Sequence, residues 1–190
     1  MIPRVVVLTD RTQLPPGRSL AEQLVACLGA GLDSVILREH DLPPVERSGL
    51  LTYLNHAGLC VLSSRLPDPV AVGIHLSSDQ PAPVRGSKPV RFGRSCHSAE
   101  EVCRAAAEGA RWATLSPFSA SDSKPGYGPP VPAEGFATEA GIPVLALGGI
   151  DPDTAADARA AGAHGVAVMG AVMRADDPAR VVAELLEATR

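Results

Sequence analysis

Eight short β-rich runs alternate with helical stretches along the 190 residues of this chain. Most of the helical stretches end on a small residue followed by glycine, a frequent way for a helix to stop before the next strand. Strands that alternate with helices pair in parallel through right-handed crossovers. The pattern therefore predicts an α/β fold, a single (β/α)8 TIM barrel over residues 1–190 with some shortened helices. A doubly wound open sheet is the alternative.

The expected strands are four or five residues long and mostly rich in β-branched or aliphatic residues. They are Val5–Thr9, Ser34–Leu37, Leu59–Leu62, Gly73–Leu76, Arg91–Ser95, Trp112–Leu115, Val144–Leu147 and Gly165–Val168. Helices are expected at Ser19–Ala30, Pro43–Ala57, Ser98–Glu108, Pro152–Ala161 and Ala179–Thr189, with a short one ending at Ala140. The residues that flank the fourth strand are few or rich in proline, so we expect short helices there at most.

Two helix starts carry local signals. Ser98 with Glu101 three residues on has the spacing of a capping box. Asp151 stands where an N-cap is expected, with Pro152 at the first helical position.

Composition limits the classes of partner. Hydrophobic residues make up 45% of the chain, enough for one sizeable core, although 190 residues are few for a barrel and require short loops. The net charge is −4, aromatic residues make up 3%, and no basic run appears, so nucleic acid is not an expected partner. No apolar run is long enough for a bilayer span and no signal peptide is evident, so we expect a cytoplasmic protein that binds no membrane.

The four cysteines lack metal-binding or disulfide spacing. Free, mostly buried thiols are expected at Cys27, Cys60, Cys96 and Cys103. For Cys96, a place in the barrel wall is favoured over a role as nucleophile.

Two expected strands near the C-terminus pass directly into glycine, at Leu147–Ile150 and Gly165–Gly170. Main-chain N–H groups close on a phosphate where no Cβ intrudes, and the loops after strands seven and eight of such barrels commonly do so. We therefore expect a phosphate site at Gly148, Gly149, Val168, Met169 and Gly170. The alternative is that these glycines only end strands and pack helices.

Side chains at the carboxyl ends of barrel strands face the active site. Arg38 follows the second expected strand, and its planar guanidinium suits phosphate oxygens. Lys124 stands in the long loop Ser116–Pro132, which we interpret as a lid. An anionic small molecule is the expected ligand.

Seven segments, in order and spread over nearly the whole chain, resemble the thiamin phosphate synthase family, which also contains the thiazole tautomerases. They are Leu8-Thr9-Asp10-Arg11, Leu37-Arg38-Glu39, Gly73-Ile74-His75-Leu76, Gly93-Arg94-Ser95, Ser121-Asp122-Ser123-Lys124, Leu147-Gly148-Gly149-Ile150 and Gly165-Val166-Ala167-Val168. The resemblance implies a (β/α)8 barrel that binds a phosphorylated thiazole at the glycine loops, with Ser95, Ser121 and Ser123 also at the substrate. The oligomeric state is open, a homodimer being one option.

The chain departs from the family where a metal-bound diphosphate is expected. The resemblance implies an Asn-Asp pair after strand three and an Asp after strand four, but these positions are Ser63-Ser64 and Gln80. Serine is a poor Mg²⁺ ligand because this cation prefers carboxylates. Asp68 and Asp79 are the nearest replacements. We therefore assign no metal ligands and no cofactor, with Mg²⁺ expected only if the chain is a synthase.

Three functions remain. The first choice resembles the thiazole tautomerases, a metal-independent proton transfer on a phosphorylated thiazole, with His40 as acid/base and Arg38 and Lys124 on the anionic groups. The family's histidine after strand six aligns with Pro117, and His40 could also be an exposed loop residue. The second is a thiamin phosphate synthase with a rebuilt Mg²⁺ site, and we expect little Mg²⁺-dependent synthesis. The third is a relative that binds a phosphate ligand without catalysis.

Overall fold

The computed structural model describes residues 2–83, 90–120 and 128–190. Its eight parallel strands form a closed barrel in chain order, with β1 paired to both β2 and β8. The strands are β1 (Val5–Leu8), β2 (Ser34–Leu37), β3 (Cys60–Ser64), β4 (Ile74–Leu76), β5 (Phe92–Cys96), β6 (Ala113–Leu115), β7 (Val144–Leu147) and β8 (Gly165–Val168). The predicted (β/α)8 barrel is confirmed, and the open sheet is wrong.

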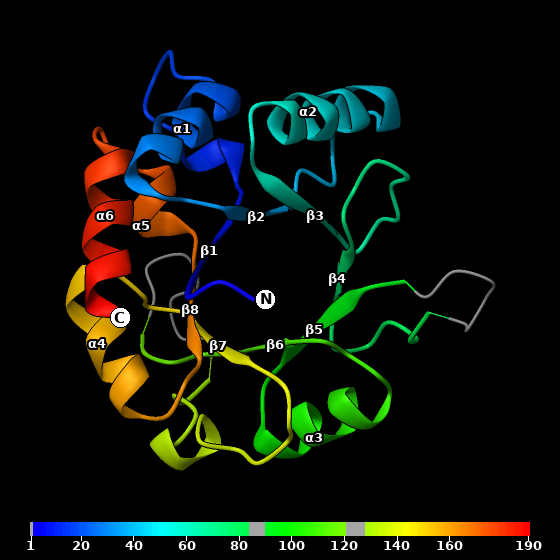
Figure 1. The fold of residues 1–190 in the computed structure, drawn as a ribbon, viewed down its shortest axis with the longest axis vertical. Coiled ribbons are helices and arrows are strands. Elements are labelled where there is room, and N and C mark those ends of the chain that lie inside the picture. The colour runs from blue at the N-terminus through cyan, green and yellow to red at the C-terminus, as the bar shows by residue number, and fades with distance from the viewer. Residues whose placement is uncertain (1, 84–89, 121–127) are drawn as a thin grey trace.

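Helices cover the barrel unevenly. They are α1 (Leu20–Ala26), α2 (Pro44–His56), α3 (Ala99–Ala107), α4 (Pro152–Ala160), α5 (Gly170–Met173) and α6 (Pro178–Ala188), with 3-10 turns at Arg11–Gln13, Leu28–Ala30 and Ala133–Gly135. Figure 1 shows α1, α4, α5 and α6 along the β1, β7 and β8 side, whereas the described residues beside β4 form loops. The expectation of short helices at most around the fourth strand is therefore confirmed for the described residues.

Three helix predictions need correction. The helix expected over Ser19–Ala30 ends at Ala26, and a 3-10 turn follows before Gly31 with φ of 99°. The helix expected to end at Ala140 is only the 3-10 turn Ala133–Gly135. The Ser98 hydroxyl caps Glu101 N–H, but the Glu101 carboxylate accepts from His97 N–H instead of completing the box.

Alternation along the strands separates two apolar layers. Seven side chains fill the barrel interior: Val6, Leu8, Ile36, Leu62, Trp112, Leu145 and Ala167. The remaining core lies between the strands and the helices. Trp112 leaves no room opposite it, because a Cβ added at Gly93 would lie 2.0 Å from Trp112 Cε2. Since side chains two residues apart share a face, these positions identify which residues point into the mouth above them.

Candidate functional site

Arg38 and Met169 meet at the carboxyl end of the barrel. Arg38 lies two residues beyond the inward-facing Ile36, and its Nη1 is 2.7 Å from Met169 Sδ, after β8. The Arg38 N–H donates to Thr9 Oγ1 over 2.9 Å, which holds the chain after β2 against the chain after β1. The structure therefore brings together two residues that the sequence assigned separately to charge recognition and to the phosphate loop.

The glycines after β7 pack against the loop after β6. Gly149 has φ of 65°, and an added Cβ would lie 2.0 Å from Ser119 Oγ. Ser119 donates to both carbonyls, through its N–H to Gly148 O and through its hydroxyl to Gly149 O. The N–H of Gly149 donates to no acceptor within the described residues. Glycine is required here by the loop contact, a reason that the sequence argument, based on ligand space alone, missed.

The loop after β8 leads into the short helix α5. Gly170 is its first residue and Met169 precedes it, whereas the Val168 side chain points outward into the core, so that only its main chain is available to a ligand. The Arg174 guanidinium lies beside Gly170, where an added Cβ would be 2.4 Å from Nη1. It donates to Gln13 Oε1 over 2.5 Å. Sequence reasoning missed Arg174, although it stands one helical turn after Gly170.

A buried polar network forms the floor of the mouth. Trp112 Nε1–H donates to His75 Nδ1 over 3.2 Å. An indole nitrogen can only donate, so the hydrogen of the neutral imidazole is on Nε2, which faces Ser95 Oγ at 3.1 Å and Thr114 Oγ1 at 3.2 Å. Burial is the main cause that lowers the pKa of His75 to about 3, and nearby Arg94 and Arg65 add to it. His75 is thus a neutral donor that orients Ser95.

His40 is an exposed residue after β2, in the company of cations. Partial burial of the ring lowers the pKa of His40, and the charges of Arg65, Arg38 and Arg47 lower it further. Burial and the neighbouring arginines thus both favour the neutral form of the His40 imidazole. The described residues show no carboxylate bonded to it.

The residues at the positions expected for Mg²⁺ ligands form hydrogen bonds with other groups of the chain. Ser63 Oγ accepts from Arg47 Nη1 over 2.9 Å and donates to Leu66 O. Gln80 accepts from Ser77 and donates to Arg65 O. In the described part of the chain, no three His, Cys, Asp or Glu side chains gather as a metal site. These residues do not fit a carboxylate-bound Mg²⁺.

The two replacement carboxylates do not restore such a site. Asp68 Oδ1 lies 3.4 Å from Ser48 Oγ on α2 and accepts from Val70 N–H. Asp79 is exposed and accepts from Ser77 Oγ over 2.6 Å. Asp68 thus bonds its own turn and α2, and Asp79 bonds the turn after β4.

The remaining predicted residues are placed as follows. Ser121, Ser123 and Lys124 lie outside the described residues. Burial raises the pKa of Cys96 to about 12, and the side chain points into the outer core, which agrees with a wall residue. Cys27 is buried too, whereas Cys60 is half-buried and Cys103 is exposed; all four are free thiols.

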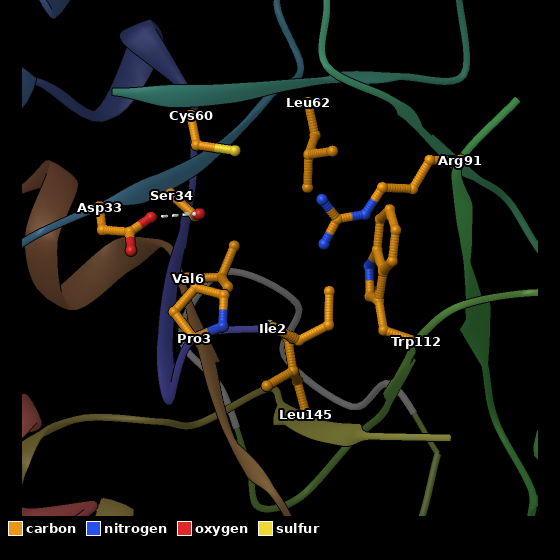
Figure 2. A pocket seen from close by; sticks show the side chains of 10 residues that line it. All are labelled: Ile2, Pro3, Val6, Asp33, Ser34, Cys60, Leu62, Arg91, Trp112 and Leu145. Atoms are coloured by element: carbon orange, nitrogen blue, oxygen red, sulfur yellow. Dashed lines mark hydrogen bonds between the residues drawn. The ribbon is translucent and has the colours of Figure 1, made fainter. Parts of the chain in front are cut away.

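The opposite end of the barrel holds a small cavity of about 50 Å³ below Trp112. Figure 2 shows Arg91 beside Trp112, with its Cζ 5.7 Å from the ring centroid, and Ile2 and Pro3 at the same cavity. Ligand pockets are typically some 300 Å³ or more, so this space is too small for a phosphorylated heterocycle. The carboxyl end of the barrel remains the candidate site.

A closed parallel barrel with glycine loops after β7 and β8 and arginines after β2 and β3 defines a (β/α)8 protein whose candidate site lies at the carboxyl ends of the strands. Residues 69–172 match the family described as thiamine monophosphate synthase. A thiamine-phosphate synthase of Moorella thermoacetica is 35% identical over 96% of this chain and 93% of its own length. The chain belongs to this family.

Other similar proteins carry the name of the same family. A thiamine-phosphate synthase of Roseiflexus castenholzii is 34% identical over 92% of this chain and 82% of its own length. The solved structure of a thiamine phosphate pyrophosphorylase from Pyrococcus furiosus has a TM-score of 0.82 and 25% identity, covering 98% of this chain and 95% of that one. In the described residues, no helix has the length and apolar character of a membrane span.

Proposed function

We propose that the chain is a thiamine-phosphate synthase, which joins a hydroxymethylpyrimidine diphosphate to a thiazole phosphate. The names of the relatives favour this reaction over the tautomerase that the sequence analysis placed first. The single observation that carries the proposal is the character of the mouth, where Arg38 and Arg65 have no carboxylate ion pair within the described residues. The mouth therefore offers positive charge for an anionic leaving group, and His40 is the candidate base near these arginines.

The reaction needs charge stabilisation more than a base. The thiazole nitrogen forms a bond to the methylene carbon of the pyrimidine, and the carbon–oxygen bond to diphosphate breaks with its electron pair on the leaving oxygen. No proton is transferred and nothing is oxidised. Because negative charge develops on the leaving group, guanidinium groups aimed at it lower the barrier.

The residues divide into two groups on this proposal. The loops at Gly148, Gly149, Met169 and Gly170 hold the phosphate of the thiazole through main-chain N–H groups. Arg38 binds the diphosphate, assisted by Lys124. The Ser95 oxygen accepts a hydrogen bond from His75 Nε2–H. Its own hydroxyl hydrogen is then directed to a substrate.

The thiazole tautomerase is the second candidate, and His40 is the observation that favours it. A neutral imidazole at the rim can accept a proton. It would act alone, however, since both nitrogens of His75 are occupied by hydrogen bonds. A relative that binds phosphate ligands without catalysis is the third candidate.

One assay separates these functions. The purified protein is incubated with both phosphorylated substrates, with and without Mg²⁺, and thiamin phosphate is measured by chromatography. Product is expected from the parent and from the matched surface variant Arg104→Ala, with kcat/KM reduced at least tenfold in Arg38→Ala. Conversion of the thiazole tautomer without thiamin phosphate would support the second candidate. Binding of thiazole phosphate without either reaction would support the third.

A further inference from the structure

We propose that Arg65 and Arg38 form a diphosphate subsite between the ends of β2 and β4 that works without a divalent cation. This inference rests on the proposed function and deepens it by assigning the chemistry of one half of the mouth. Its basis is the placement of Arg65, which neither the sequence analysis nor the family resemblance singled out.

The main chain at Arg65 is fixed at the rim of the barrel. Arg65 directly follows β3 and has φ of 60°, an uncommon conformation for a residue with a side chain. Its N–H donates to His75 O over 2.9 Å, and its carbonyl accepts from Gln80 Nε2 over 3.0 Å. The β3 and β4 ends therefore hold this residue from both sides, and its exposed side chain starts from a rigid base.

The positive charge of Arg65 acts on titratable groups of three neighbouring segments at the mouth. It influences His40 after β2, the buried His75 of β4 and Asp79 after β4. Arg38 follows Leu37 of β2, which pairs with Ser63 of β3, so Arg38 and Arg65 leave neighbouring strands at the same end of the barrel, and the charges of both act on His40. Asp79 is the carboxylate on that side, but it is bonded to Ser77 and forms no ion pair with Arg65.

Some arginines of the described chain are paired with carboxylates. Ion pairs with Asp or Glu involve Arg11, Arg94, Arg104, Arg180 and Arg190. Arg38 and Arg65 are outside this set. Two guanidinium groups at the carboxyl end of the barrel with no carboxylate within ion-pair distance are suited to the paired oxygens of a phosphate or diphosphate.

A buried cation occupies the place where a metal would be expected. Arg47 comes from α2 and is 3% exposed, and it donates to Ser63 Oγ and to Leu37 O, both over 2.9 Å. Its Nη2 is also 3.4 Å from Ser64 O. The oxygen atoms at the end of β3 thus already coordinate a positive charge, which would repel Mg²⁺ and attract an anion.

The test uses inorganic pyrophosphate as the probe, titrated calorimetrically into the full chain. We expect the parent to bind it in EDTA with a dissociation constant within about twofold of that in Mg²⁺. Arg65→Ala should weaken this binding at least tenfold, and Arg65→Lys should recover part of it. Arg104→Ala, an exposed arginine on α3, is the matched control and should bind like the parent. Urea unfolding of each variant verifies that the barrel remains folded.

Pyrophosphate binding that requires Mg²⁺, or that is unchanged in folded Arg65→Ala, would overturn the inference. The outcomes remain separable from those of the proposed function. Thiamin phosphate made only with Mg²⁺ would support the synthase and contradict the metal-free subsite. Pyrophosphate bound in EDTA without any synthesis would support the subsite and contradict the synthase.

Discussion

The two sides of the proposed anion site at the barrel mouth differ in their chemical groups. The β7 and β8 side offers main-chain N–H groups from glycine loops, whereas the β2 to β4 side offers the guanidinium groups of Arg38 and Arg65. The first kind of site depends on backbone conformation and tight loop packing. The second depends on side-chain length and on which charges lack a partner. A conservative substitution should therefore have different consequences on the two sides.

The largest effect is expected at Gly149. Gly149→Val places a Cβ 2.0 Å from Ser119 Oγ and 2.4 Å from Ala120 O at a positive φ. It should abolish binding of thiazole phosphate and lower the free energy of unfolding by about 1–3 kcal/mol. Calorimetric titration and urea unfolding measure the two effects. Gly141→Val is the matched control, because Gly141 has φ of 74° with nothing within 4 Å. Equal behaviour of the two variants would contradict the packing argument.

On the arginine side the effect should be electrostatic and leave the fold intact. Arg38→Ala should weaken an anionic substrate by about 1.5–3 kcal/mol, because a charge-assisted hydrogen bond is lost. Its free energy of unfolding should stay within about 1 kcal/mol of the parent value. Arg180→Ala removes an exposed arginine paired with Glu184 on α6 and serves as the control. Unchanged substrate affinity in Arg38→Ala would place the anion elsewhere.

His75 lies beneath both sides of the mouth, and its protonation should make the free energy of unfolding depend on pH. Its pKa is lowered to about 3 in the folded chain from an ordinary 6.5, so the fold favours the neutral form. Its contribution to stability is fully present above pH 6.5 and is lost as the pH falls toward 3, at up to about 1.4 kcal/mol per pH unit. Urea unfolding between pH 7 and 5 should show a smaller acid slope in His75→Gln. An unchanged slope would show that His75 is not the source of the pH dependence.

The smallest effect is expected at Asp79. Asp79→Asn keeps an acceptor for Ser77 Oγ and removes an exposed charge that is not part of a metal cluster within the described residues. Pyrophosphate affinity and the rate of synthesis should change less than about twofold, with or without Mg²⁺. Mg²⁺-dependent synthesis that disappears in Asp79→Asn would instead reveal a rebuilt metal site and remove the contrast between the two sides.

The order of strands and helices and the position of the glycine loops were predictable because their signals are local. Val144–Leu147 and Gly165–Val168 have the bounds expected, and both run into the loops that the glycines indicate. The α1 segment was less predictable, since nothing in its apolar pattern shows that the helix changes to a 3-10 turn after Ala26.

The sequence alone determined the barrel, the family resemblance and the loss of the expected metal ligands, because strand periodicity, glycine stops and missing carboxylates are read residue by residue. Tertiary structure decided which charges are left without partners. Arg47 spans from α2 to Ser63, Arg38 reaches Met169 from 131 positions away, and Trp112 fixes the tautomer of His75. These contacts join residues far apart in the chain, and their energies depend on burial and distance, which only the closed barrel sets.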